Sequence, residues 1–181
     1  AVCLALYAEW QGAVVKRILE LSIYLPFLLP PIVTGLSLLV TSAQLDISRG
    51  LTTIIIGHTV FVLAVAYRLI LTRLQTLPRS MIEASSDLGA TQLQTFRFII
   101  LPYMMSAITT GAVLALTLSF DETLISVFLA GDRMTLPLRL WAMMRVGFTQ
   151  QINALVTIVL LISLILAAAV AFRLKLGNQS N

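Results

Sequence analysis

The sequence predicts an all-α, polytopic membrane protein folded as a helical bundle. Of its 181 residues, 59% are apolar and only 11% are charged, whereas soluble domains have roughly 45–50% apolar and about 25% charged residues. The mean hydropathy is +0.97, and a soluble domain of this length has too little interior to bury so much apolar surface. Four long stretches lack Lys, Arg, Asp and Glu altogether, namely 21–45, 50–67, 98–120 and 146–172.

The uncharged stretches predict the membrane spans. A helix rises 1.5 Å per residue, so ~20 residues cross a hydrocarbon core of ~30 Å. Helices are expected because an open strand edge leaves backbone groups unsatisfied in lipid. The first eight residues are apolar but too short to span, so we expect them to be the end of a further helix and the chain to be N-terminally truncated. The prediction is about four complete spans plus the end of a fifth, with the four at 28–46, 50–71, 99–121 and 152–173.

Prolines mark where these helices are expected to begin. Proline disrupts a helix interior but suits the first turn. Pro30 and Pro31 therefore predict that residues 16–29 form a separate amphipathic or interfacial helix and that the first span starts near Pro31. Pro102 lies near the start of the third span for the same reason.

Basic residues indicate the orientation in the membrane. If segments 9–20, 72–98 and the tail after 172 share one side, that side is the more basic and is predicted to be the cytoplasm. The basic residues are scattered, so a nucleic-acid partner is not expected. The cytoplasmic side would hold Lys16, Arg17, Arg73, Arg79, Arg97, Arg173 and Lys175, and the other side Arg49, Arg133, Arg139 and Arg145.

The segment 73–98 is long for a connection between membrane helices. It predicts two short helices. In the first, Ser80 fits an N-cap with Glu83 three residues later, and Gly89 can end the helix in a left-handed conformation. The second is expected over 91–97. These features alone are also compatible with a solvated amphipathic loop helix.

The residues of this loop follow a known spacing. Glu83-Ala84-Ser85 is followed after three residues by Gly89 and after nine more by an Ile-Ile-Leu-Pro run over 99–102. This pattern resembles the EAA---G---------I-LP signature of permease subunits of binding-protein-dependent ABC importers, with Ser85 in place of the second Ala. Segment 29–35 resembles the start of the third membrane helix of that family. Segments 119–122 and 135–137 are similar to its spermidine/putrescine-type branch.

The resemblance implies one importer-type permease domain over 1–181, in which 73–98 is a cytoplasmic coupling loop. The expected partners are a cytoplasmic ABC ATPase dimer, a second permease subunit, identical or different, an extracytoplasmic solute-binding protein and membrane lipid. The expected location is the bacterial inner membrane, and the solute a polyamine or a related small molecule. The coupling residues would be Glu83, Ala84, Ser85, Asp87, Gly89, Ile99, Leu101 and Pro102.

The chain itself is not expected to be an enzyme. It has no phosphate-binding GxxxxGK[ST] motif, so ATP and Mg²⁺ would be used by the partner ATPase and no cofactor is expected on this chain. A membrane-embedded enzyme would need acids, or Ser with His, inside the spans. A secondary transporter or channel would explain the spans but would give no reason for the pattern over 83–102.

Four polar residues are candidates for the substrate path, each with an alternative. Asp121 and Glu122 either cap the membrane exit or attract a cationic substrate. His58 is expected to hydrogen-bond a neighbouring helix rather than to relay protons. Asn153 is either the cap of the last span or part of the path. Between these residues, 124–130 is too short to cross and predicts a re-entrant or interfacial piece, followed by a turn at 131–133.

Overall fold

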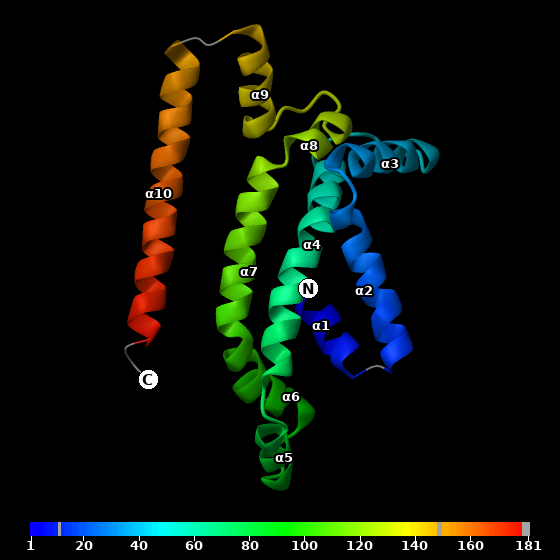
Figure 1. Ribbon diagram of the computed structural model, residues 1–181, viewed down its shortest axis with the longest axis vertical. Coiled ribbons are helices and arrows are strands. Elements are labelled where there is room, and N and C mark those ends of the chain that lie inside the picture. The colour runs from blue at the N-terminus through cyan, green and yellow to red at the C-terminus, as the bar shows by residue number, and fades with distance from the viewer. Residues whose placement is uncertain (11, 148–149, 179–181) are drawn as a thin grey trace. The chain divides into compact units, whose positions relative to one another are not determined.

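The computed structural model describes residues 1–10, 12–147 and 150–178, and within them the secondary structure is helical (Figure 1). It divides into two compact units, 1–135 and 136–181, which are described separately. The first contains α1 Val2–Glu9, α2 Ala13–Leu28, α3 Pro31–Gln44, α4 Leu51–Gln75, α5 Arg79–Asp87, α6 Gln92–Thr95, the π-helical turn Phe96–Ile100, α7 Leu101–Asp121 and α8 Thr123–Leu129.

The second unit consists of α9 Leu136–Val146 and α10 Gln150–Asn178. Helix α10 includes all of the predicted span 152–173, and its stretch Asn153–Ile165 is apolar. Asn153 lies inside the first turn of α10, so the prediction that it caps this helix is wrong.

Two helical stretches of the first unit are long and apolar enough to cross a membrane. They are α4, with 25 residues, and the continuous helix Gln92–Asp121, with 30 residues. They confirm helices at the predicted spans 50–71 and 99–121. The second begins seven residues early because α6 runs through the π turn into α7 without a break.

The predicted span 28–46 is wrong. The chain turns by 108° between α2 and α3, and α3 has only 14 residues, which is about 21 Å of helix. Pro31 does begin a helix, as expected, and α2 is a separate helix. However, α2 runs beside α4 along the bundle and α3 projects sideways at the end of it (Figure 1). By length and composition, the bent pair of α2 and α3 is the third candidate span among the described residues.

The corner between α2 and α3 has a specific backbone cause. Pro30 has no N–H, so the carbonyl of Pro26 lacks its usual partner four residues later. The Thr34 hydroxyl donates to that carbonyl at 3.1 Å instead, and Thr34 is buried. This bond fixes the direction in which α3 leaves α2.

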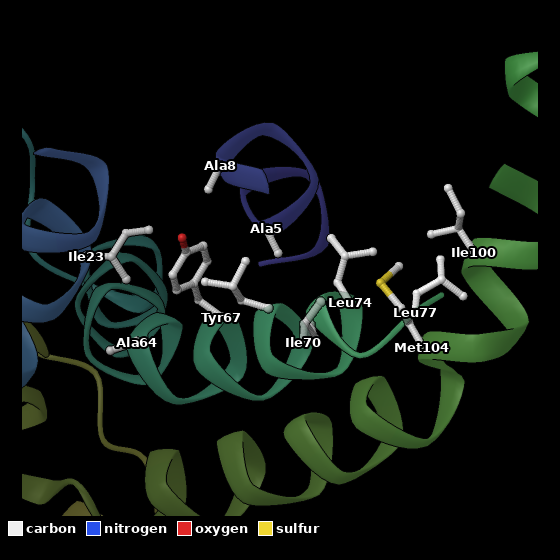
Figure 2. Close-up of a cluster of buried hydrophobic side chains, with 11 residues drawn as sticks. Ala5, Ala8, Ile23, Ala64, Tyr67, Ile70, Leu74, Leu77, Ile100 and Met104 are labelled. Atoms are coloured by element: carbon white, nitrogen blue, oxygen red, sulfur yellow. The ribbon is translucent and has the colours of Figure 1, made fainter. Parts of the chain in front are cut away.

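Helix α4 is the centre of the first unit, and α1, α2, α7 and α8 pack against it. On the α1 and α2 side, Tyr67 and Leu71 are almost fully buried, and Met104 of α7 joins the same cluster (Figure 2). At the end of this cluster, the Glu9 carboxylate accepts hydrogen bonds from Lys16 and Gln75, both at 3.3 Å. The prediction that segments 9–20 and 72–98 lie at the same end of the bundle is therefore confirmed.

Candidate functional site

At that same end, helix α5 finishes in a left-handed turn at Gly89. The Gly89 φ is +75°, a conformation that only glycine adopts without strain. Its N–H donates to the Ser86 carbonyl at 2.9 Å, and the Ala90 N–H donates to the Ser85 carbonyl at 3.0 Å. This pair of bonds is a Schellman motif, so the predicted role of Gly89 as a helix terminator is confirmed.

The predicted N-cap of α5 is wrong. Arg79 is the first residue of the helix, Pro78 is its cap, and Ser80 lies inside the first turn. The helix starts earlier because the Met81 N–H already donates to the Pro78 carbonyl at 3.1 Å. A capping box forms instead on the second short helix, where the Thr91 and Gln94 side chains each accept a bond from the other residue's N–H. This second helix is confirmed.

Helices α5 and α6 are joined by a buried pair of hydroxyls. Ser85 and Thr95 are 6% and 7% exposed, and their hydroxyl oxygens lie 2.8 Å apart. Ser85 also donates to the Ile82 carbonyl at 2.8 Å. Thr95 was not recognisable as a site residue from the sequence, because only the fold brings it opposite Ser85.

The outer face of this helical hairpin is exposed. Glu83 and Asp87 lie one turn apart on α5, and both are exposed, as is Ala84 between them. Leu88 is 88% and Phe98 70% exposed. Between α5 and α6 lies an apolar groove of about 420 Å³, lined by Met81, Ala84, Ser85, Leu88, Ala90, Gln94, Thr95, Phe98 and Ile99.

The hairpin is continuous with α7 through a π turn. Leu101 donates its N–H to the Phe96 carbonyl five residues earlier. The extra residue in this turn accommodates Pro102, which lacks an N–H and would clash with the carbonyl four residues before it in a regular α-helix. Ile99 and Leu101 are partly buried beside Ile100, which is 3% exposed. The hairpin and α7 are therefore joined by continuous helix.

At the opposite end of the unit, His58 connects three helices. Its Nδ1 lies 2.7 Å from the Ser119 hydroxyl of α7, and its Nε2 lies 2.8 Å from the Ser126 hydroxyl of α8. The expectation that His58 hydrogen-bonds neighbouring helices is confirmed.

The two adjacent acids differ in their surroundings. The Glu122 carboxylate accepts from the N–H groups of Leu124 and Ile125, at 3.0 and 3.2 Å, and so caps α8. Asp121 is the last residue of α7, and it is exposed. Glu122 thus fits the capping alternative, whereas the Asp121 carboxylate faces outward.

Helix α8 packs tightly on two glycines that the sequence analysis did not single out. A Cβ on Gly57 of α4 would lie 2.5 Å from Leu129, and a Cβ on Gly35 of α3 would lie 2.8 Å from Phe128. The Leu129 carbonyl also accepts bonds from Thr53 and from the Gly50 N–H, at 2.9 and 3.0 Å. The expected short apolar piece is therefore a helix held between α3 and α4. The predicted turn after it is confirmed at Gly131, where the Arg133 N–H donates to the Ala130 carbonyl at 3.0 Å.

One face of α7 carries exposed polar side chains along most of its length. Ser106, Thr110, Thr117 and Asp121 are spaced by four, seven and four residues, which places them on one side of a helix. All four are exposed in this unit. Helix surfaces that face lipid tails seldom carry such a stripe, so it marks a face that meets water, lipid headgroups or another chain.

Glu20 is a polar residue that the sequence analysis did not single out. It lies in α2, which packs against α4, and it is close to the buried Tyr67. The Tyr67 and Tyr24 rings pack edge to face at 6.0 Å, and both hydroxyls are buried. In the sequence, Glu20 stands directly before the uncharged stretch 21–45, and this position is the pattern that could have drawn attention to it.

The chain resembles known transport proteins over most of its length. It is 41% identical over 142 residues to the putrescine transport system permease protein PotI of Escherichia coli K12, covering 75% of this chain and 50% of PotI. It is 38% identical over 141 residues to the spermidine/putrescine transport system permease protein PotC of the same organism, covering 77% and 53%. With PotC of Haemophilus influenzae the identity is 34% over 152 residues, covering 83% and 59%.

The chain thus spans about half the length of the curated relatives it matches. A family model, described as binding-protein-dependent transport system inner membrane component, matches residues 1–176. This match agrees with the apolar helices of the structure and with a location in the bacterial inner membrane. The chain belongs to the family of inner membrane components of binding-protein-dependent transport systems.

Proposed function

We propose that the chain acts as a permease subunit of an ATP-driven importer, and that the α5–α6 hairpin couples it to a cytoplasmic ABC ATPase dimer. The main support for this proposal is the structure of the hairpin. Its outer face is exposed, and hydrogen bonds within it hold α5 and α6 together. Its exposed acids and apolar groove suit a partner's cleft. ATP and Mg²⁺ would be bound by the ATPase, with no cofactor on this chain.

The rigidity of the hairpin suits it for transmitting force. The Schellman motif at Gly89, the capping box at Thr91 and the Ser85–Thr95 bond leave few of its backbone groups free to rearrange. Because α6 continues into α7, a movement imposed by the ATPase would tilt α7 against α4. Such rocking of helices is a common basis of alternating access.

The substrate path is proposed to follow the polar face of α7. The path follows the outer part of this face, where the Thr117 hydroxyl leads to Asp121, and a carboxylate there suits a cationic substrate. Ser106 and Thr110, nearer the hairpin, lie beside Arg68 and Arg73 instead. Because similar proteins are named as permeases for putrescine and spermidine, we propose a polyamine as the solute. His58 and Glu122 would shape the outer end of this path. Asn153, in the second unit, is proposed separately as a residue that contacts the substrate.

The pore would be completed by a second permease subunit, identical or different, and the outer end would meet an extracytoplasmic solute-binding protein. The exposed polar face of α7 supports this, because a helix with such a face needs a neighbour or water in a membrane. A secondary transporter or channel remains the alternative function, and it assigns no role to the exposed hairpin.

Charge reversal on the hairpin tests the proposal. In the assembled transporter, Glu83→Lys should reduce ATPase co-purification and substrate-stimulated ATP hydrolysis at least tenfold, without loss of membrane insertion. The matched control is Asp132→Lys, an equal charge reversal at an exposed residue of the other end, which should leave ATPase binding unchanged. Normal ATPase binding and transport by the Glu83→Lys variant would refute the proposed coupling role.

A further inference from the structure

A second groove lies between α4 and α7, near the hairpin end of the unit. It encloses about 420 Å³, and no carboxylate contributes to it. Leu69 and Ala107 contribute apolar side chains to its lining, and Thr72, Thr76, Ser106 and Thr110 contribute hydroxyl groups. The lining residues are Arg68, Leu69, Thr72, Arg73, Thr76, Ser106, Ala107 and Thr110.

Arg73 is held in a fixed position within this groove. Its guanidinium stacks 4.1 Å above the Tyr103 ring, and its Nε donates to the Tyr103 carbonyl at 3.2 Å. The Tyr103 hydroxyl donates in turn to the Thr76 carbonyl at 3.0 Å. A stacked guanidinium keeps its terminal N–H donors in a defined plane, which favours recognition of an anion.

Arg68 lies one and a half turns earlier in α4. It is exposed and makes no hydrogen bond or ion pair with any part of the chain that the structure describes. Glu20, which is close to the neighbouring Tyr67, does not line the groove. The groove therefore holds two positive charges with no acid of its own, and like charges close together in a partly apolar setting call for a counter-anion.

The distance of the two arginines from the end of α4 indicates where this anion comes from. Arg68 lies seven residues before the end of α4, which is about 10 Å of helix, and Arg73 lies about 3 Å from that end. This range corresponds to the boundary between hydrocarbon and lipid headgroups. Basic grooves between membrane helices on the cytoplasmic side are suited to lipid phosphates.

We propose that this groove binds the phosphate group of an anionic phospholipid of the cytoplasmic leaflet. Arg68 and Arg73 supply the charged contacts, and the hydroxyls of Thr72, Ser106 and Thr110 supply further donors. The apolar side chains of Leu69 and Ala107 contact the first part of the acyl chains. The assignment of the leaflet rests on the proposed cytoplasmic position of the hairpin.

The test measures lipid retention and is independent of transport. The complete transporter is reconstituted in phosphatidylethanolamine vesicles with and without cardiolipin, extracted, and the lipid that remains bound is counted by native mass spectrometry. An arginine near the membrane surface contributes about 1 kcal/mol to such binding, or about fivefold. Arg68→Gln, which breaks no hydrogen bond or ion pair among the described residues, should therefore weaken cardiolipin binding about fivefold, and Arg68→Lys should retain most of it.

Arg79→Gln is the matched control, because Arg79 is also exposed and lies outside the groove. Undiminished cardiolipin retention by both Arg68→Gln and Arg73→Gln would overturn the proposal. A second arm adds inorganic phosphate to the detergent-solubilised transporter. If phosphate binds with the same dependence on Arg68 while lipid binding does not depend on it, the ligand is a soluble anion and the lipid assignment is wrong.

Discussion

The hydroxyl oxygens of Ser85 and Thr95 lie 2.8 Å apart in a buried contact that ties α5 to α6. This bond explains why serine is compatible with a position where the family signature has alanine. A small side chain is required there by the burial, and the hydroxyl adds a link that alanine lacks.

A double-mutant cycle measures this link. Ser85→Ala and Thr95→Val should show a coupling free energy of about 1 kcal/mol in the stability of the hairpin, as is typical of a hydrogen bond. Hydrogen exchange over residues 79–95 in the assembled transporter provides the measurement. Strict additivity of the two substitutions would show that the bond contributes nothing.

The left-handed turn at Gly89 predicts sensitivity to a single methyl group. Gly89→Ala should destabilise the hairpin by about 1–2 kcal/mol, because its backbone conformation disfavours a side chain although the space around it is open. Gly12→Ala is the control, since Gly12 has open space and a φ of −63°. The expected result is faster hydrogen exchange around residues 85–91 in Gly89→Ala alone, and equal exchange in the two variants would contradict it.

Close packing of α8 predicts a contrast between two glycines within membrane helices. Gly57→Ala should cost about 1–3 kcal/mol because its Cβ would meet Leu129 and Ile125 at 2.5 and 2.7 Å. Gly111→Ala should be tolerated, since the nearest atom would be 3.6 Å away. Thermal unfolding of the purified transporter compares them, and the account of α8 fails if Gly111→Ala is the more damaging change.

The corner between α2 and α3 predicts a role for one hydroxyl. Thr34→Val keeps the shape of the side chain but leaves the Pro26 carbonyl without its donor, at an expected cost of about 1–3 kcal/mol. Thr41→Val is the control, because the Thr41 hydroxyl is exposed and bonds a carbonyl of its own helix. Thermal unfolding midpoints should fall for Thr34→Val only, and a similar decrease in both variants would argue against this view of the corner.

Local chemistry predicted the hairpin well. The turn at Gly89, the second short helix and the exposed acids of α5 depend on residues close together in the sequence, so their spacing was informative. Ser80 was misassigned because Ser and Pro both favour helix starts, and the Met81 bond to Pro78 decided between them. The bonding of His58 followed from the cost of an unpaired polar group in a membrane helix.

The angle between α2 and α3 and the packing of α8 could not be predicted from the sequence, because both depend on tertiary contacts. A Pro-Pro pair marks a helix boundary but does not give the angle between the two helices, so the sideways course of α3 was missed. The importance of Gly35 and Gly57 depends on α8, which follows them by about 70 to 90 residues and shares no local pattern with them.

The central claim is that the hairpin faces the cytoplasm and contacts an ATPase there. With Cys3 replaced by serine, Leu88→Cys on the hairpin and Leu45→Cys at the opposite end each give one exposed thiol. Cross-linking in inner membrane vesicles should join Leu88→Cys, but not Leu45→Cys, to the ATPase subunit, with a yield that changes when ATP is added. Labelling of Leu88→Cys by an impermeant thiol reagent applied from outside the cell, with no cross-link to the ATPase, would contradict the account.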